Sequence, residues 1–260
     1  MISRRKFLFA LAGAGVGGVG SELWAGNEPF HRQCALRTES IPAPAGWRGR
    51  TVLFVSDVHY GSFFGPSEAA ALAQIVRAQR PDLVLLGGDL AQTPDTDLAG
   101  FFSSWSPGCP TIFTPGNHDT GVEHPSPVME QARAAGATVL CNAAERWDGI
   151  TIVGLPSALR MAQRTSLLDA RGFKLVLGHE PDVWDGYRPP ELLHLAGHTH
   201  GGQVRIFDQA FYLPTLGRKY VRGRFSREGD RTLIVSEGVG CTTIHLRINC
   251  PPEVVRLQFT

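Results

Sequence analysis

The chain has 260 residues, of which 43% are hydrophobic and 19% are charged, and its formal net charge at pH 7 is +1. This composition is typical of a globular protein with a sizeable core, and it excludes a long disordered or low-complexity chain. The nearly neutral charge, without a basic stripe, argues against binding to nucleic acid.

Residues 1–25 have the features of an export signal. The pair Arg4-Arg5 precedes a mildly apolar, Gly/Ala-rich stretch of 14 residues over 7–20. This arrangement is typical of a twin-arginine signal, and the stretch is too short and too rich in glycine for a stable membrane-spanning helix. We therefore expect the twin-arginine machinery to export the protein, which would be periplasmic or peripherally membrane-associated. Leu23-Trp24-Ala25 fits the cleavage rule only at its last residue, so removal of the signal stays open.

The next segment, residues 26–50, contains prolines and glycines and is predicted to be an irregular leader. From Thr51 onwards, apolar and β-branched runs alternate with helical patterns, and we assign residues 51–260 to one domain. Helices are predicted over 68–79 and 126–135. Strands of a second sheet are predicted over 231–236 and 253–259. The expected fold is α/β, with two packed mixed β-sheets flanked by helices.

Five short polar clusters each follow one of the apolar runs. They are Asp57-Val58-His59, Gly88-Asp89, Gly116-Asn117-His118-Asp119, Gly178-His179 and Gly197-His198-Thr199-His200-Gly201-Gly202. The preceding runs (TVLFVS, LVLLG, TIFTP, KLVLG and HLAG) are typical of strands buried on both faces. Because open α/β sheets place ligand sites at the carboxyl ends of their strands, we expect these clusters to converge at one edge. Their composition is that of a two-metal hydrolytic centre.

Individual roles follow from residue type and position. Asp57 and His59, two positions apart at a strand end, can both face one ion. Asp89, on the next strand, is the candidate for the carboxylate that bridges two ions. One amide and three imidazoles supply further ligands: Asn117, His179, His198 and His200. Oxygen and nitrogen ligands without sulfur suit Mn, Fe, Zn or similar ions, so we predict two divalent metal ions.

His118 directly follows Asn117, so its side chain is expected to diverge from the ligands and to face the substrate. Asp119 is predicted to accept a hydrogen bond from the second ring nitrogen of His118. His118 would then be the general acid that protonates the leaving oxygen while a metal-bound hydroxide attacks the phosphorus atom in line.

Taken in order, the five clusters resemble the motifs of the calcineurin-like metallophosphoesterases, from about Thr51 to His200. The resemblance implies an α/β sandwich with two metals. It implies that one is bound by Asp57, His59, Asp89 and His200, and the other by Asp89, Asn117, His179 and His198. One departure is Gly154-Leu155-Pro156-Ser157, which stands where many relatives have an acidic residue, so the substrate pocket is expected to differ.

The string GHTHGGQVR, together with the export signal, is similar to a bacterial subgroup of small exported or membrane-associated phosphodiesterases. Some relatives act on UDP-2,3-diacylglucosamine in lipid A synthesis, which makes that lipid, or another lipid-linked or nucleotide-linked phosphoester, a candidate substrate. The expected activity is that of a phosphodiesterase or pyrophosphatase. Two alternatives stay open, namely a phosphomonoesterase and a catalytically silent metal-binding scaffold. The full ligand set with His118 favours an enzyme, and the lack of a visible basic clamp favours diesters or pyrophosphates.

Other polar and aromatic residues carry weaker predictions. Four histidines lack partners at ligand spacing and are expected at the surface or in packing: His31, His124, His194 and His245. Arg218 and Arg247 are weak candidates for phosphate contact. Phe63, Phe64 and Trp184 fit an apolar wall or core packing equally well. The five cysteines show no CxxC spacing, so a thiolate metal site is not expected, although one pair could bridge in an oxidising compartment.

Overall fold

The computed structural model describes residues 23–25, 30–121 and 126–260. Most of the predicted signal, His124 and the side chain of His31 lie outside this described part. Within these ranges, no helix has the length and apolar character that a bilayer span requires.

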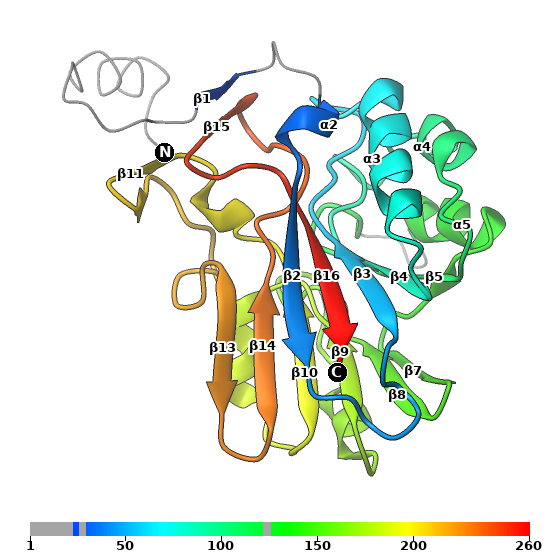
Figure 1. Cartoon of the computed structure of the whole chain (residues 1–260). Coiled ribbons are helices and arrows are strands. Elements are labelled where there is room, and N and C mark those ends of the chain that lie inside the picture. Colours follow the sequence, from blue (N-terminus) through cyan, green and yellow to red (C-terminus); the bar gives the residue numbers. More distant parts are fainter. Residues whose placement is uncertain (1–22, 26–29, 122–125) are drawn as a thin grey trace.

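Two six-stranded mixed sheets form the framework (Figure 1). The first has the order β2 (Ala35–Ile41), β16 (Glu253–Phe259), β3 (Thr51–Val55), β4 (Leu83–Gly87), β5 (Thr111–Thr114) and β6 (Thr138–Val139). The second has the order β13 (Gly223–Arg227), β14 (Arg231–Val235), β10 (Leu192–Ala196), β9 (Lys174–Leu177), β8 (Ile150–Gly154) and β7 (Ala143–Trp147). Two small pairs join β1 (Leu23–Ala25) to β15 (Leu246–Ile248), and β11 (Arg205–Ile206) to β12 (Gln209–Ala210).

Short helices follow several of the strands. The α-helices are α2 (Phe30–Gln33), α3 (Pro66–Ala78), α4 (Ala99–Ser104) and α5 (Pro127–Ala134), and the 3-10 helices are η1 (Thr165–Asp169), η2 (Pro181–Gly186) and η3 (His200–Gly202). The two predicted helices are confirmed as α3 and α5, with shifted ends. Helix α3 begins at Pro66, and the Glu68 carboxylate accepts the Gly65 N–H at 3.0 Å.

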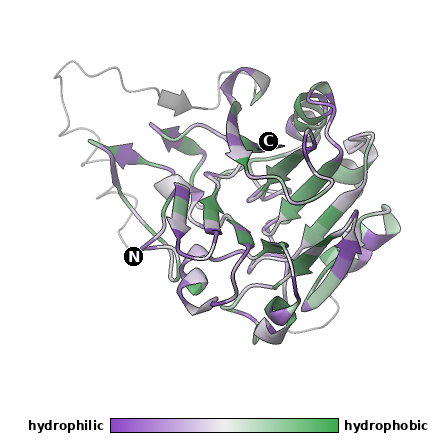
Figure 2. Ribbon diagram, turned by 60° about the horizontal axis from the view of Figure 1, so that its bottom comes forward, coloured by the Kyte–Doolittle hydropathy of each residue, from purple (hydrophilic) through white to green (hydrophobic). Residues whose placement is uncertain are grey.

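The predicted central strands are buried along their whole length in both sheets. Side chains of β3 alternate between two cores: Val52 and Phe54 pack against the second sheet, whereas Leu53 and Val55 pack under the helices. A third cluster packs η2 against the outer face of the second sheet. Figure 2 shows the hydrophobic residues concentrated in the strands between these layers. The layering explains why these runs are continuously apolar rather than alternating.

Two sequence-based expectations are corrected. The segment 26–50, predicted to be irregular, contains strand β2, which pairs in parallel with β16 from Ala35–Glu253 to Ile41–Phe259. It was missed because an edge strand with one exposed face needs few apolar residues. The predicted strand at 253–259 exists, but it lies in the first sheet, between β2 and β3, rather than in the second. Only β14 of the predicted pair belongs to the second sheet.

Among the other predicted residues, His194 is fully buried in β10, as expected for a packing residue. All five cysteines are unpaired, and Cys250 is buried.

Candidate metal centre

The predicted ligands meet where the carboxyl ends of β3, β4, β5, β9 and β10 face one another. Three overlapping groups have ligand atoms within 4.8 Å of each other: Asp57–His59–His200, Asp89–His179–His198, and His59–Asp89–His118. Every residue of the first two groups is buried. The expected convergence of strand-end clusters at one edge therefore occurs.

Asp89 lies between the two buried groups. Its Oδ2 atom is 3.1 Å from Nε2 of His179 and 3.7 Å from Nε2 of His59. Its Oδ1 atom accepts the backbone N–H of His118 at 2.8 Å. One carboxylate oxygen thus faces ligands of both groups, which is the position that a bridging ligand requires.

Asp57 connects the two sheets. It is fully buried, and its Oδ1 atom accepts the backbone N–H of His198 at 2.9 Å. The same Oδ1 atom lies 3.5 Å from Nε2 of His200. A residue that follows β3 is thereby fixed to the segment that follows β10.

The histidine rings are oriented by acceptors at their far side. His179 donates from Nδ1 to the Gly87 carbonyl at 3.1 Å, and His198 donates from Nε2 to the Thr215 carbonyl at 2.9 Å. Because a carbonyl can only accept, each ring carries a proton on that outer nitrogen and turns its other nitrogen toward the centre. His59 is held similarly, with Nδ1 3.1 Å from the Gln92 side-chain oxygen. Such outer hydrogen bonds are typical of metal-binding imidazoles.

The inner atoms fit a divalent cation. Nε2 of His59 and Nε2 of His200 are only 3.1 Å apart. Among the described residues, the buried Oδ1 of Asn117 has no hydrogen-bond partner. Buried polar atoms without partners are uncommon in proteins, and a bound cation would satisfy such an oxygen. Nitrogen and oxygen donors of this kind suit borderline divalent metals.

Burial and neighbouring charges set the protonation of these groups. Burial lowers the pKa of His59 to about 4 and raises the pKa of Asp57 above its usual value. Burial also lowers the pKa of His200, with help from His59. Although burial opposes it, the Asp89 carboxylate raises the pKa of His179 well above its usual value. His59 and His200 are therefore neutral at pH 7, which is the form that binds a metal.

The backbone is strained at most of the predicted ligands. Positive φ angles between 49° and 70° occur at Asp57, His59, Asp89, His198 and His200. Residues other than glycine seldom occupy this left-handed region, and each such residue costs about 1–3 kcal/mol. Five of the sixteen non-glycine residues with positive φ in the described part of the chain are thus predicted ligands, and strained backbone of this kind is frequent at functional sites.

Glycines before the ligands make room for neighbouring ligands. A Cβ atom on Gly88, which has φ +85°, would lie 2.5 Å from Nδ1 of His179. A Cβ atom on Gly197 would lie 2.2 Å from Oδ2 of Asp57, on the opposite sheet. The glycine-ligand pairs in the sequence therefore reflect close approach inside the centre.

His118 lies at the centre, but Asp119 does not orient it. Nδ1 of His118 is 2.8 Å from the Gln92 carbonyl, so this nitrogen carries the proton and Nε2 is left for chemistry. Asp119 instead accepts the backbone N–H groups of Ala91 and Gly116, each at 2.8 Å. The prediction that His118 donates to Asp119 is therefore wrong, because two backbone N–H groups already occupy the buried Asp119 carboxylate. Asp119 fixes the loops that carry the site.

Sequence reasoning missed two residues of the site. Gln92 holds His59 with its side chain and His118 with its carbonyl; it lies three residues after Asp89 in the same strand-end loop. Arg160 is exposed and donates from Nε to the Asn117 carbonyl at 3.1 Å. Gln92 could have been predicted as a site residue because it lies three residues after Asp89. Arg160 lies in none of the five polar clusters, so its sequence context did not indicate a role.

Residues 154–157, where the sequence departs from the family pattern, lie beside a buried hydrogen-bond network. The Ser157 hydroxyl donates to the carboxylate of Glu180, which also accepts the Ala158 N–H at 2.9 Å. Glu180 directly follows His179, so the segment after β8 is tied to the loop that carries this ligand.

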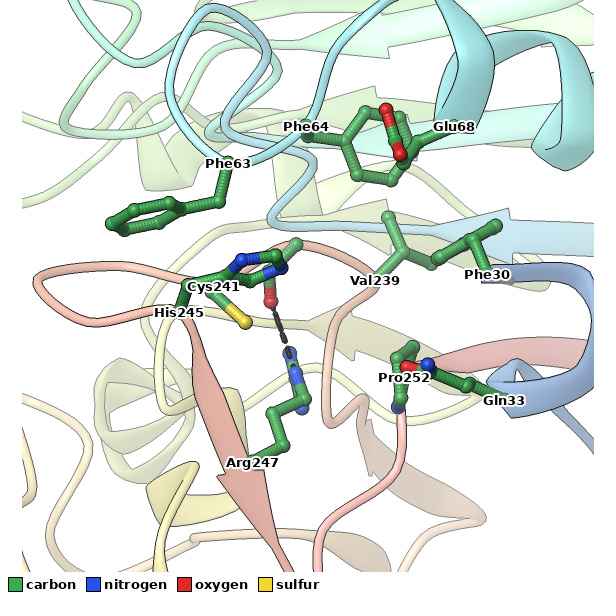
Figure 3. A pocket seen from close by; sticks show the side chains of 11 residues that line it. Phe30, Gln33, Phe63, Phe64, Glu68, Val239, Cys241, His245, Arg247 and Pro252 are labelled. Atoms are coloured by element: carbon green, nitrogen blue, oxygen red, sulfur yellow. Dashed lines mark hydrogen bonds between the residues drawn. The ribbon is translucent and has the colours of Figure 1, made fainter. Parts of the chain in front are cut away.

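A separate cavity of about 70 Å³ is lined by Phe63, His245 and Arg247, among others, and by none of the predicted ligands (Figure 3). Phe63 stacks on His245 at its rim, with ring centroids 5.0 Å apart. Arg247 is buried there and donates to carbonyls of the loop after β14; its Nη2 atom also lies 3.4 Å from Nδ1 of His200. Arg247 is thus not placed for phosphate contact. Trp184 packs in the outer core of the second sheet, so only Phe63 of the proposed aromatic wall is exposed.

The chain is similar in sequence to several known proteins. Residues 50–202 match the family model of the calcineurin-like phosphoesterases. The chain is 32% identical to "Phosphodiesterase YaeI" of Escherichia coli K12 over the whole of both chains. It is 28% identical to "Uncharacterized metallophosphoesterase YkuE" of Bacillus subtilis 168, covering 97% of this chain and 96% of that one. A solved dimetal phosphatase from Danio rerio is 11% identical, with a TM-score of 0.48, covering 82% of this chain and 100% of that chain. With more than half of its length matched, including all five clusters, the chain belongs to the calcineurin-like phosphoesterase family and is a metallophosphoesterase.

Proposed function

We propose that the protein is a two-metal phosphodiesterase or pyrophosphatase that acts on a lipid-linked or nucleotide-linked phosphoester of the cell envelope. The observation that carries the proposal is the pair of buried groups, Asp57–His59–His200 and Asp89–His179–His198, with Asp89 between them. Preference for a diester is supported by the full-length relative named as a phosphodiesterase. UDP-2,3-diacylglucosamine is one candidate substrate.

Asp57, His59, Asp89 and His200 would hold one divalent ion, and Asp89, Asn117, His179 and His198 the other. Such ions supply Lewis-acid activation of the phosphoryl group and a water of lowered pKa. Orientation of the general acid and donation of its proton fall to residues of the chain. The Gln92 carbonyl fixes the ring of His118, and the protonated Nε2 atom of His118 donates to the leaving oxygen.

A phosphomonoesterase is the second candidate. The exposed guanidinium of Arg160 lies beside Asn117, where it would balance the extra negative charge of a monoester. This is the kind of basic group that was not visible in the sequence pattern.

Kinetics on two model esters test both activities. Purified protein, loaded with Mn or Zn, is assayed on bis-p-nitrophenyl phosphate and on p-nitrophenyl phosphate. We expect faster turnover of the diester and a strong loss in His118→Ala, with His245→Ala as a control outside the ligand groups. Faster turnover of the monoester would assign the protein to the second candidate. Undiminished activity of His118→Ala would refute the role of this histidine, and no turnover of either ester would favour a silent scaffold.

We also propose export by the twin-arginine machinery to the periplasm, with peripheral membrane association. The support is the Arg4-Arg5 pair before the apolar stretch, which lies outside the described residues. The double variant Arg4→Lys/Arg5→Lys is expected to remain in the cytoplasm in a fractionation experiment. Unchanged export of this variant would refute the assignment.

A further inference from the structure

Two aromatic side chains project into solvent from a short hairpin. We call residues 203–217 the aromatic hairpin; it contains the antiparallel pair β11–β12 and the residues that follow it. Phe207, between the two strands, is 85% exposed, and Tyr212 is 71% exposed. No other large hydrophobic side chain in the described part of the chain is more than half exposed. Leaving such rings in water forgoes roughly 1.5–3 kcal/mol each, which suggests a partner.

Hydrogen bonds from Arg205 and the pairing of β11 with β12 hold the aromatic hairpin in one conformation. The buried guanidinium of Arg205 donates to the Gly201 carbonyl and to the Asp208 carboxylate, both at 2.8 Å. Backbone pairing joins Arg205 to Ala210 and Ile206 to Gln209. The exposure of Phe207 therefore belongs to a fixed turn, and a partner can bind it with little loss of conformational entropy.

The surroundings of the hairpin are basic on balance. Residues 203–227 contain six basic residues and one acidic residue: Arg205, Arg218, Lys219, Arg222, Arg224 and Arg227 against Asp208. The acid at the tip is paired with Arg205 and with Arg222, the latter at 2.6 Å. Lys219 and Arg227 pair with Asp185, Arg222 with Glu237 and Arg224 with Glu39, so the basic residues of this region outnumber these acids and Asp208 by two. Aromatic rings at a tip, with cations behind them, are characteristic of segments that bind at the surface of an anionic bilayer.

The aromatic hairpin also lies at the rim of the candidate metal centre. It begins three residues after His200, and its Thr215 carbonyl accepts the hydrogen bond from Nε2 of His198. Figure 1 shows β11 at the same end of the molecule as the carboxyl end of β14. A membrane that contacts Phe207 would therefore lie close to the mouth of the centre.

We propose that the aromatic hairpin inserts Phe207 and Tyr212 into the interfacial region of a bilayer with anionic headgroups, and so positions the metal centre over phosphoesters carried by that surface. This deepens the proposed function, because it specifies a substrate embedded in the membrane. The binding step itself does not require hydrolysis.

Vesicle binding tests the proposal. Full-length protein is sedimented with vesicles of phosphatidylcholine, with and without phosphatidylglycerol. We expect binding to the anionic vesicles that weakens with salt, and a partition coefficient roughly tenfold lower in the double variant Phe207→Ser/Tyr212→Ser. The matched control is Leu36→Ser, which removes an apolar side chain that is 38% exposed on β2. Equal binding by wild type and the double variant, or an equal loss in the control, would contradict the proposal.

A second measurement reports on the hairpin itself, because residues 1–25 could also contact lipid in every variant. In Phe207→Trp, fluorescence is expected to shift to the blue with anionic vesicles and to be quenched by brominated lipid more than in wild type. No excess quenching would overturn the proposal. So would a wild-type dimer that Phe207→Ser/Tyr212→Ser converts to a monomer, since the hairpin would then be a self-association surface.

Turnover of soluble bis-p-nitrophenyl phosphate separates the two proposals. The double variant should keep wild-type turnover of this ester, because the hairpin does not contribute a ligand. Lost lipid binding with intact turnover supports the membrane role, whereas lipid binding without any turnover would leave that role standing and refute the phosphodiesterase.

Discussion

The two sheets supply different chemistry to one centre. The loops after β3, β4 and β5 of the first sheet provide both carboxylates, the Asn117 amide and the candidate acid His118. The loops after β9 and β10 of the second sheet provide imidazoles, His179, His198 and His200. The first sheet thus supplies both carboxylates, including the candidate bridging ligand Asp89. The second sheet supplies three of the four imidazole ligands. Neither layer holds a complete site.

This division makes the centre sensitive to how the sheets pack. Asp57 of the first layer accepts the His198 N–H of the second, and Gly197 leaves room for the Asp57 carboxylate. The apolar layer between the sheets sets the spacing, with Phe54 from one sheet and Leu195 from the other in the same cluster. Four variants test this division of roles between the two sheets, and Asp89→Asn is expected to reduce activity most.

Asp89→Asn should have the largest effect, because the amide removes the charge that lies between both groups of ligands. We expect kcat on bis-p-nitrophenyl phosphate to fall by about 10³-fold or more, together with a loss of bound metal. The control is Asp95→Asn, an exposed acid in the same loop. Near-normal kcat with full metal content would show that Asp89 is not a bridging ligand.

His118→Gln separates proton donation from metal binding within the first layer. We expect a loss of about 10²–10³-fold on an alkyl ester, whose leaving oxygen needs a proton, and a smaller loss on a p-nitrophenyl ester. Metal content, measured in parallel, should stay at the wild-type value. If the variant loses metal instead, His118 is a ligand, as its proximity to His59 and Asp89 would allow.

Gly197→Ala tests the contact between the layers. Because the new Cβ atom would lie 2.2 Å from Oδ2 of Asp57, the carboxylate must move away from the centre. We expect metal affinity, measured by calorimetric titration, to fall about 10–100-fold. Gly186→Ala is the matched control, since its Cβ atom would have no neighbour within 4 Å. Equal affinities in the two variants would argue against a tight junction at Gly197.

His194→Leu probes the second layer away from the ligands. Burial lowers the pKa of His194 to about 3, whereas an unfolded histidine has a pKa of about 6.5. Below pH 6.5 the unfolded chain therefore takes up a proton that the folded chain does not, and stability falls by up to about 1.4 kcal/mol per pH unit. The variant should lose this dependence, so its unfolding free energy should decline less between pH 7 and pH 5 than that of wild type. Parallel declines in urea titrations would contradict this.

The strand ends were predictable from sequence because both sheets are covered on both faces. Runs such as TVLFV and LVLLG must then be continuously apolar, and the polar residue after each run marks the edge where ligands gather. The glycines before Asp89 and His198 made the pattern stronger, since close approach excludes a side chain at those positions.

The rest depends on partners distant in sequence. Strand β2 was missed because its alternating sequence ALRTESI becomes a strand through pairing with β16, more than 200 residues away. The orientation of His118 was predicted wrongly because its acceptor, the Gln92 carbonyl, comes from another loop, whereas Asp119 is its sequence neighbour. The exposure of Phe207 likewise could not be predicted, because the turn that carries it is fixed by the hydrogen bond of Arg205 to the Gly201 carbonyl.

We infer that residues of both sheets together hold two divalent ions. Elemental analysis of the full-length protein, after reconstitution with Mn or Zn and removal of free metal, tests it directly. We expect two ions per chain in wild type, and a lower count both in Asp57→Ala of the first sheet and in His179→Ala of the second. One ion or fewer in the reconstituted wild-type protein would contradict it.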